Sequence, residues 1–191
     1  MAKGAAAAGG KGSPEAQLRA FVAKFDAKNR TLIRAVRKAL RERFAGAFEL
    51  VYDNYNFLVI GYSPSERPSD TIVSMAADAN GVTLFFLWGV TLPDPKRVLQ
   101  GSGNQVRRIR LPSVGVLARP EVKALLAAAV AQSRARFRAS GRPMLMIRSV
   151  SAKQRPRRKP AGPRPRRAPP ESVSARTGSG SPLDPASRRS G

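Results

Sequence analysis

Residues 49–111 read ELVYDNYNFLVIGYSPSERPSDTIVSMAADANGVTLFFLWGVTLPDPKRVLQGSGNQVRRIRL, and this stretch decides the fold class. Apolar runs alternate in it with short polar segments rich in Asn, Asp, Gly and Pro, a pattern typical of strands separated by turns. Asn80-Gly81 is the clearest hairpin turn, and Asp53-Asn54-Tyr55-Asn56 predicts another. The run Val82–Trp88 is the most apolar and predicts a central strand. The stretch therefore predicts an antiparallel sheet of about five strands.

Helical patterns flank this sheet on both sides. Ser13-Pro14-Glu15 has the residue types of a helix start, and apolar residues follow it at helical spacing. A second helix is predicted from about Lys28 to Phe44, with six cations on its outer face. Arg119-Pro120-Glu121 predicts a final helix that reaches about Phe137. Because strands and helices do not alternate regularly, we expect an α+β fold with the C-terminal helix packed on one face of the sheet.

Two shorter elements are also predicted. Asp94 is a suitable cap for a short helix from Pro95 to Leu99. Residues Met144–Ile147 form an apolar run that could add a short strand at the edge of the sheet. The predicted domain thus spans residues 14–150. Residues 1–13 and 151–191 are predicted to be disordered, because they contain too few large apolar side chains to offset their ordering entropy.

The chain contains no cysteine and no histidine among its 191 residues. Disulfides, Cys or His zinc sites, and catalysis by Ser-His-Asp or Cys-His groups are therefore excluded. Proton transfer would need Asp, Glu, Lys or Tyr, and a metal would have only oxygen ligands. No catalytic residue and no metal ligand is assigned from the sequence, and the cofactor is unknown.

The net charge of +23 is spread over the chain. Residues 14–150 carry 22 basic and 10 acidic side chains, and residues 151–191 carry 11 basic and 2 acidic ones. Such a field attracts nucleic acid through phosphate contacts. The alternative is a high-GC genome that enriches arginine without function. The cations of the tail predicted to bind nucleic acid are Arg155, Arg157, Arg158, Lys159, Arg164, Arg166 and Arg167.

Two further sites are predicted from local motifs. The polar inset, defined as Tyr52, Asp53, Asn54, Tyr55 and Asn56, offers donors and acceptors for a small polar ligand. The alternative is a turn whose side chains satisfy their own backbone. A loop with arginines after it could hold a phosphate on its backbone amides, although a plain turn is the simpler interpretation. Its residues are Gly101, Ser102, Gly103, Asn104, Arg107 and Arg108.

Two aromatic residues are candidate stacking surfaces. Trp88 and Tyr62 could each stack on a planar ligand. For Trp88, packing in the core is the simpler prediction. Glu49 and Tyr52 are three residues apart on one strand, so they are predicted to lie on opposite faces of the sheet.

The segment Glu49-Leu50-Val51-Tyr52, followed by Tyr-Asp-Asn-Tyr-Asn, Arg-Pro-Ser-Asp, Leu-Pro-Asp-Pro and Gly-Ser-Gly, resembles the YdhG-like bacterial family of unknown function (DUF 1801). The resemblance covers residues 16–137. It implies an N-terminal helical pair, a sheet and a C-terminal helix, but no common activity. A related branch is linked to iron handling, which implies surface carboxylates. The acids near the relevant strands are Glu49, Asp53, Glu66 and Asp70.

These observations predict a non-enzymatic cytoplasmic protein with an undetermined ligand or partner, whose basic tail binds nucleic acid nonspecifically. A small-ligand or iron-handling module is the first alternative, and an enzyme without histidine or cysteine is the second. The longest apolar stretch, Val82–Val90, is far shorter than the roughly 20 residues of a membrane span, so no membrane contact is expected. The exposed face of the sheet could instead form a homodimer.

Overall fold

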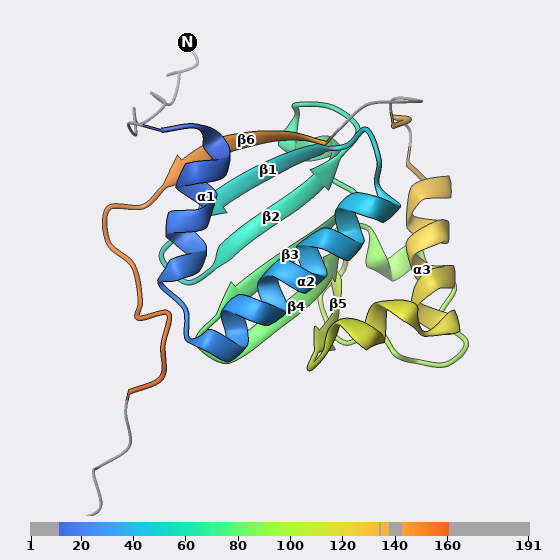
Figure 1. Cartoon of the computed structure of the whole chain (residues 1–191). Coiled ribbons are helices and arrows are strands. Elements are labelled where there is room, and N and C mark those ends of the chain that lie inside the picture. The colour runs from blue at the N-terminus through green and yellow to red at the C-terminus, as the bar shows by residue number, and fades with distance from the viewer. Residues whose placement is uncertain (1–11, 134, 138–142, 161–191) are drawn as a thin grey trace, which may run out of the picture. The chain divides into compact units, whose positions relative to one another are not determined.

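Six strands form one mixed sheet, and three α-helices accompany it, with α1 and α2 over one face, in the computed structural model (Figure 1). These counts refer to residues 12–133, 135–137 and 143–160, which the structure describes. The sheet has the strand order β5-β4-β3-β2-β1-β6. Its strands are β1 (Phe48–Asp53), β2 (Leu58–Ser63), β3 (Val73–Asp78), β4 (Gly81–Phe86), β5 (Arg107–Leu111) and β6 (Met144–Val150).

The two N-terminal helices begin at side-chain caps. Helix α1 (Pro14–Ala23) follows Ser13, whose hydroxyl accepts a hydrogen bond from the amide of Ala16 at 3.3 Å. Helix α2 (Ala27–Arg43) follows Asp26, whose carboxylate accepts the amide of Asn29 at 2.7 Å. Each cap satisfies a backbone donor that has no partner within the helix. Both predicted helices are therefore confirmed to within a residue or two.

The central strands form the predicted hairpins. Strands β1 to β5 pair antiparallel in sequence order. Between β3 and β4, Gly81 has a φ of 125°, which only glycine adopts without strain. Between β1 and β2, the amide of Asn54 donates to the carbonyl of Phe57 at 2.9 Å. The expected turns at Asn80-Gly81 and in the polar inset are thus confirmed.

The edge strand β6 changes the predicted sheet. It pairs parallel with β1, with a register irregularity between Val51 and Tyr52, so the sheet has six strands and is mixed rather than antiparallel. The run Met144–Ile147 was expected only as a short edge segment, and β6 extends to Val150. A parallel partner has no local turn signal, because a long connection must carry the chain back across the sheet.

Three details of the connections differ from the predictions. No helix forms at Pro95–Leu99; instead, the carboxylate of Asp94 accepts the amides of Val98 and Leu99 and holds a turn. Helix α3 (Pro120–Ala131) ends before Phe137. Short 3-10 turns at η1 (Pro68–Asp70), η2 (Gly89–Thr91) and η3 (Val114–Ala118) complete the chain.

The hydrophobic core lies between the sheet and the helices. Ile33, Val36 and Leu40 of α2 are buried against the strands, as their helical spacing predicts. Helix α3 contributes Leu125 and Leu126 to the same core. It packs against η3 beside the sheet, rather than on the sheet face as predicted (Figure 1). The reason is that η3 turns the chain away from β5 before α3 begins.

The opposite face of the sheet carries residues that alternate with those of the core. Tyr52, Val59 and Phe85 on this face are half-buried. The loop before β3 covers part of it, since Thr71 lies against Gly61. The predicted homodimer contact through this face stays a prediction.

Candidate functional site

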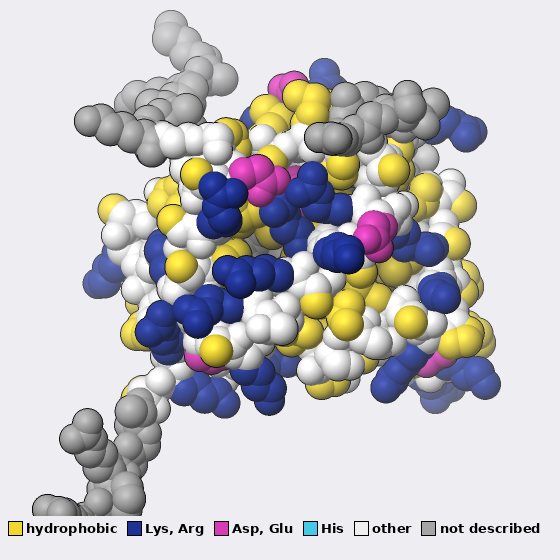
Figure 2. Space-filling model, in the orientation of Figure 1, with side chains coloured by type: hydrophobic (Ala, Val, Ile, Leu, Met, Phe, Trp, Pro, Cys, Tyr) yellow, Lys and Arg dark blue, Asp and Glu magenta, His cyan; other side chains and the backbone are white. Residues whose placement is uncertain are grey.

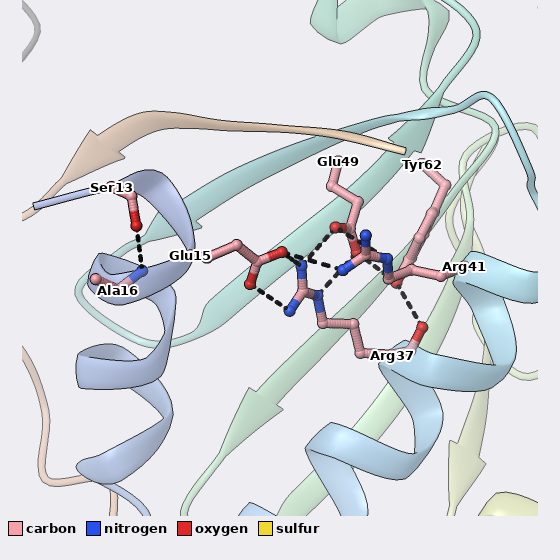
Figure 3. Close-up of polar contacts among 7 residues, drawn as sticks. All are labelled: Ser13, Glu15, Ala16, Arg37, Arg41, Glu49 and Tyr62. Atoms are coloured by element: carbon pink, nitrogen blue, oxygen red, sulfur yellow. Dashed lines mark hydrogen bonds and ion pairs between the residues drawn. The ribbon is translucent and has the colours of Figure 1, made fainter. Parts of the chain in front are cut away.

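An ion-pair cluster joins α1, α2 and β1 (Figure 3). Glu49 on β1 is fully buried, and Arg37 on α2 binds its two carboxylate oxygens, with Nε to Oε1 at 2.9 Å and Nη2 to Oε2 at 2.7 Å. Arg37 also binds Glu15 of α1, and Arg41 adds a contact to Glu15 at 3.0 Å. Paired guanidinium and carboxylate groups of this geometry are among the stronger polar contacts in proteins.

Burial and neighbouring charges shift the pKa values of Arg37 and Tyr62 in this cluster. Burial lowers the pKa of Arg37, but its hydrogen bonds to Glu49 and Glu15 outweigh that effect, so the net pKa is raised and the guanidinium remains charged. Burial, together with the charge of Glu49, raises the pKa of Tyr62 well above its ordinary value. Its neutral hydroxyl lies 3.3 Å from Oε1 of Glu49. We conclude that the cluster holds α1, α2 and β1 together.

A second buried carboxylate, Asp53, lies at the end of β1. Lys24 of α1 contacts its Oδ2 at 2.6 Å, and Arg157 contacts its Oδ1 at 3.0 Å. Asp53 is fully buried and Arg157 is 4% exposed. The one carboxylate of the polar inset is therefore buried inside the fold. Asp53 is paired with two cations and is not accessible to a ligand.

The other members of the polar inset divide between structure and surface. Asn54, Tyr55 and Asn56 are exposed at the β1–β2 turn. Tyr52 lies on the face of the sheet opposite Glu49, as predicted, since Glu49 contacts α2 and Tyr52 is three residues away on the strand. Its hydroxyl is buried and has no hydrogen-bond partner in the described part of the chain. The five residues do not converge on one site.

Residues 151–160, which we call the strap, run along the end of α1 and the β1–β2 turn. The amide of Ser151 donates to the carbonyl of Asp53, and the amide of Arg155 donates to that of Tyr55, both at 2.9 Å. Arg158 donates to the carbonyls of Ala23 and Lys24 at the C-terminal end of α1. Cations at this end of a helix are stabilised by its dipole.

The strap was predicted as the beginning of a disordered tail. The first ten residues of that predicted tail are instead placed against the domain. Arg157 pairs with Asp53, and the amides of Ser151 and Arg155 donate to the carbonyls of Asp53 and Tyr55. Arg157 is thereby buried within the fold, whereas Arg155, Arg158 and Lys159 are exposed. Arg164, Arg166 and Arg167 lie outside the described residues, as does most of the predicted N-terminal segment.

The strap, the β1–β2 turn and the β3–β4 turn line a shallow pocket of about 360 Å³, and Asp78 is the acidic residue in its lining. Phe57 and Asn56 line it from the turn, and Arg155 and Lys159 line it from the strap. Phe57 is 39% exposed, and the neighbouring Tyr55 is 42% exposed. The guanidinium of Arg155 lies 5.6 Å from the centre of the Tyr55 ring. We call these five residues the hairpin–strap surface.

The predicted phosphate loop is exposed and separate from this surface. Gly101, Ser102, Gly103 and Asn104 are all exposed. The guanidinium of Arg107 donates to the carbonyls of Gly103 and Val106. The loop thus presents carbonyl oxygens to Arg107, and a phosphate cannot bind to these acceptors. Arg108 projects from the opposite face of β5. The loop and its arginines therefore do not form a cradle of converging donors.

Trp88 is a candidate that the sequence assigned to the core. It is 53% exposed, so the core prediction is wrong, while Tyr62 is fully buried and cannot stack on a ligand. Trp88 lines a pocket of about 480 Å³ with Asp70, Thr91 and Gln132. The adjacent Gly89 was the available signal, because a glycine after an apolar strand indicates that the strand ends there.

Cations dominate the surface that carries α1 and α2 (Figure 2). Within the described residues, ion pairs use only the cations Lys24, Arg37, Arg41 and Arg157, and their partners are Glu15, Glu49 and Asp53. Other acids serve the backbone: Asp26, Asp78 and Asp94 accept amides in caps and turns. Because these acids pair with the four cations or accept backbone amides, they do not form ion pairs with the other described surface cations. The surface therefore keeps an excess of positive charge.

No metal site is evident in the part of the chain that the structure describes, where no three Asp or Glu residues gather. Glu49 and Asp53, two of the four acids that an iron-handling role would require at the surface, are buried in ion pairs. No described helix is long and apolar enough to cross a membrane. Comparisons of the chain with models of known protein families, with curated proteins and with solved structures found no match.

Proposed function

We propose that this protein binds nucleic acid nonspecifically, with the hairpin–strap surface as its single-strand contact. The observation that supports this proposal is the pairing of two exposed aromatic rings, Tyr55 and Phe57, with two exposed cations, Arg155 and Lys159. Aromatic rings stack on bases of any sequence, and cations contact the phosphates between them. The net charge of +23 would draw a polyanion to this surface from a distance.

The proposal includes the cations that the sequence assigned to a tail. Arg164, Arg166 and Arg167 follow the strap in sequence and would extend phosphate binding beyond Lys159. In this proposal, the domain is a binding module and not an enzyme. Its cytoplasmic location and its membership of the YdhG-like family remain proposals that rest on composition and on the sequence motifs.

A small-ligand or iron site at the polar inset has less support. Asp53 already has two cationic partners at 2.6 and 3.0 Å, and ligand binding there would have to displace one of them. Breaking a buried ion pair costs about 3–5 kcal/mol, which a weak ligand cannot supply.

The test is fluorescence anisotropy of a labelled 20-mer single strand and the matching duplex, titrated with the full chain over a salt series. Tyr55→Ala/Phe57→Ala should weaken single-strand binding by about tenfold or more, with an unchanged salt slope, and should affect the duplex less. Arg155→Gln/Lys159→Gln should lower the slope of log K against log salt by about 1.4 for the single strand.

A matched control removes two exposed cations elsewhere, in Arg119→Gln/Lys123→Gln near the start of α3. An equal loss of binding in this control would mean diffuse attraction and would reject the hairpin–strap surface. A loss confined to Arg164→Gln/Arg166→Gln/Arg167→Gln would also reject it and would move the site to the residues after the strap.

A further inference from the structure

The pocket beside Trp88 is built from three segments that are distant in sequence. Asp70 is the last residue of η1, and Thr71 follows it. Trp88 directly precedes η2, and Thr91 ends it. Gln132 directly follows α3. With about 480 Å³ it has room for a small molecule or a long side chain. It is separate from the hairpin–strap surface and shares no lining residue with it.

Trp88 presents its indole to this pocket from a fixed backbone. The side-chain amide of Gln132 donates to the Trp88 carbonyl at 3.1 Å. The hydroxyl of Thr91 lies 2.9 Å from the same carbonyl and 2.8 Å from Oε1 of Gln132. Behind it, Gly89 packs so closely on Arg107 that a Cβ at this position would lie 2.5 Å from the Arg107 Cβ. The backbone that carries the half-exposed ring is therefore held in place at the pocket wall.

A carboxylate lies in the described lining of this pocket. Asp70 is the one charged side chain among its described lining residues, and no described cation forms an ion pair with it. Hydroxyls of Ser65 and Ser69 donate to its Oδ2 and Oδ1. Each carboxylate oxygen accepts more than one hydrogen bond, so Asp70 keeps capacity for a ligand donor.

The end of α3 also lines the pocket. The pocket is lined by Ala129, Gln132 and Ser133, where this helix of 12 residues ends. The C-terminal end of a helix carries a partial negative charge and favours cations. Helix α3 has no basic residue in its last turn, and Arg134 and Arg136 follow it in the sequence.

We propose that this pocket binds a small organic cation, a protonated amine or a guanidinium, which rests on the Trp88 ring and pairs with Asp70. A cation over an indole face is attracted by the ring, and tryptophan is the best of the aromatic residues for this contact. The methyl and methylene groups of Ile72 and Ala129 in the lining suit the alkyl part of such a molecule. An anion would meet the Asp70 carboxylate and the end of α3 instead.

The chain contains one tryptophan, so tryptophan emission, excited apart from that of the three tyrosines, reports on this pocket. The full chain is titrated with agmatine, which carries both a guanidinium and an amine, at constant ionic strength. Urea, a planar neutral molecule, and inorganic phosphate are titrated in parallel. Agmatine should give a saturable change in Trp88 emission, and urea and phosphate should give none. No saturable change with agmatine, or the same change with urea or phosphate, would overturn the proposal.

Two variants test the contacts. Asp70→Asn keeps the side-chain shape and should weaken agmatine binding about fivefold, the upper effect of an incompletely buried ion pair. Glu66→Gln removes an exposed acid outside the lining and should leave binding unchanged. Trp88→Leu, measured by calorimetry because it lacks the fluorophore, should weaken binding further. Wild-type affinity in both Asp70→Asn and Trp88→Leu would overturn the proposal, with a thermal melt verifying that each variant is folded.

Discussion

Nη2 of Arg157 lies 3.0 Å from Oδ1 of Asp53, although 104 residues separate the two in sequence. The contact ties the strap to the end of β1. Lys24 completes the group from α1, so one buried carboxylate links the N-terminal helix, the sheet and the segment after the last strand.

Neutralising Asp53 should destabilise the fold. Asp53→Asn preserves the side-chain shape but leaves the buried guanidinium of Arg157 without its counter-charge. We expect the free energy of unfolding to fall by about 3 kcal/mol, the lower end for breaking a buried ion pair. Urea denaturation at neutral pH measures this change.

The control for this substitution is Glu66→Gln, because Glu66 is exposed and forms no ion pair with the described residues. It should change stability by less than about 0.5 kcal/mol. An Asp53→Asn effect as small as that of the control would show that Asp53 and Arg157 contribute no net stability.

Shortening the chain should have an effect that depends on the position of the cut. A chain that ends at Ser149 lacks Val150, which pairs with Asp53, and lacks the whole strap. We expect it to lose about 3 kcal/mol or more, since Asp53 also loses Arg157. A chain that ends at Pro160 keeps these contacts and should unfold at the same denaturant concentration as the full chain. Equal midpoints for both shortened chains would contradict the role of the strap.

Acid should weaken the cluster around Arg37. Hydrogen bonds from Arg37 lower the pKa of Glu15 below its ordinary value of 4.5, although partial burial opposes the shift. The unfolded chain then binds a proton at Glu15 before the folded protein does. The stabilisation is complete above about pH 5 and is lost as the pH falls through 4.5 toward the lowered value.

Glu15→Gln tests this pH dependence. The variant should be less stable than the wild type at neutral pH, and the difference should shrink as the pH falls below 4.5. Thermal melts from pH 3 to pH 7 compare the two proteins (roughly the range over which carboxylates titrate). A difference that stays constant over this range would show that Arg37 does not favour the charged form of Glu15.

The approach of η2 to β5 should not tolerate a larger residue. In Gly89→Ala the new Cβ would lie 2.5 Å from the Cβ of Arg107 and 2.8 Å from its amide nitrogen. The backbone must shift, and we expect a loss of about 2 kcal/mol together with a change in Trp88 emission. Chemical denaturation followed by fluorescence measures both effects.

Gly103→Ala is the matched control in the same region. A Cβ at Gly103 meets no atom within 4 Å, so this variant should retain the wild-type stability. Equal stability of Gly89→Ala and the wild type would mean that η2 can move away from β5 at little cost.

The elements that depend on neighbouring residues were predicted well. Ser13 and Asp26 cap α1 and α2 with their own side chains, and Asn80-Gly81 forms its hairpin. The errors occurred where a local signal competed with another use of the same side chain. Asp94 is a good helix cap, but its carboxylate holds a turn at Val98 and Leu99 instead.

The sequence by itself determined the α+β class, the hairpins, the absence of histidine and cysteine chemistry, and the excess of positive charge. These follow from composition and from patterns that repeat within a few residues. Only the tertiary structure decided that Asp53 is buried with Arg157, that Trp88 is exposed, and that Asp70 and the end of α3 line one pocket. The physical reason is that side-chain burial and pairing depend on which distant segments pack together, and no local pattern encodes that choice.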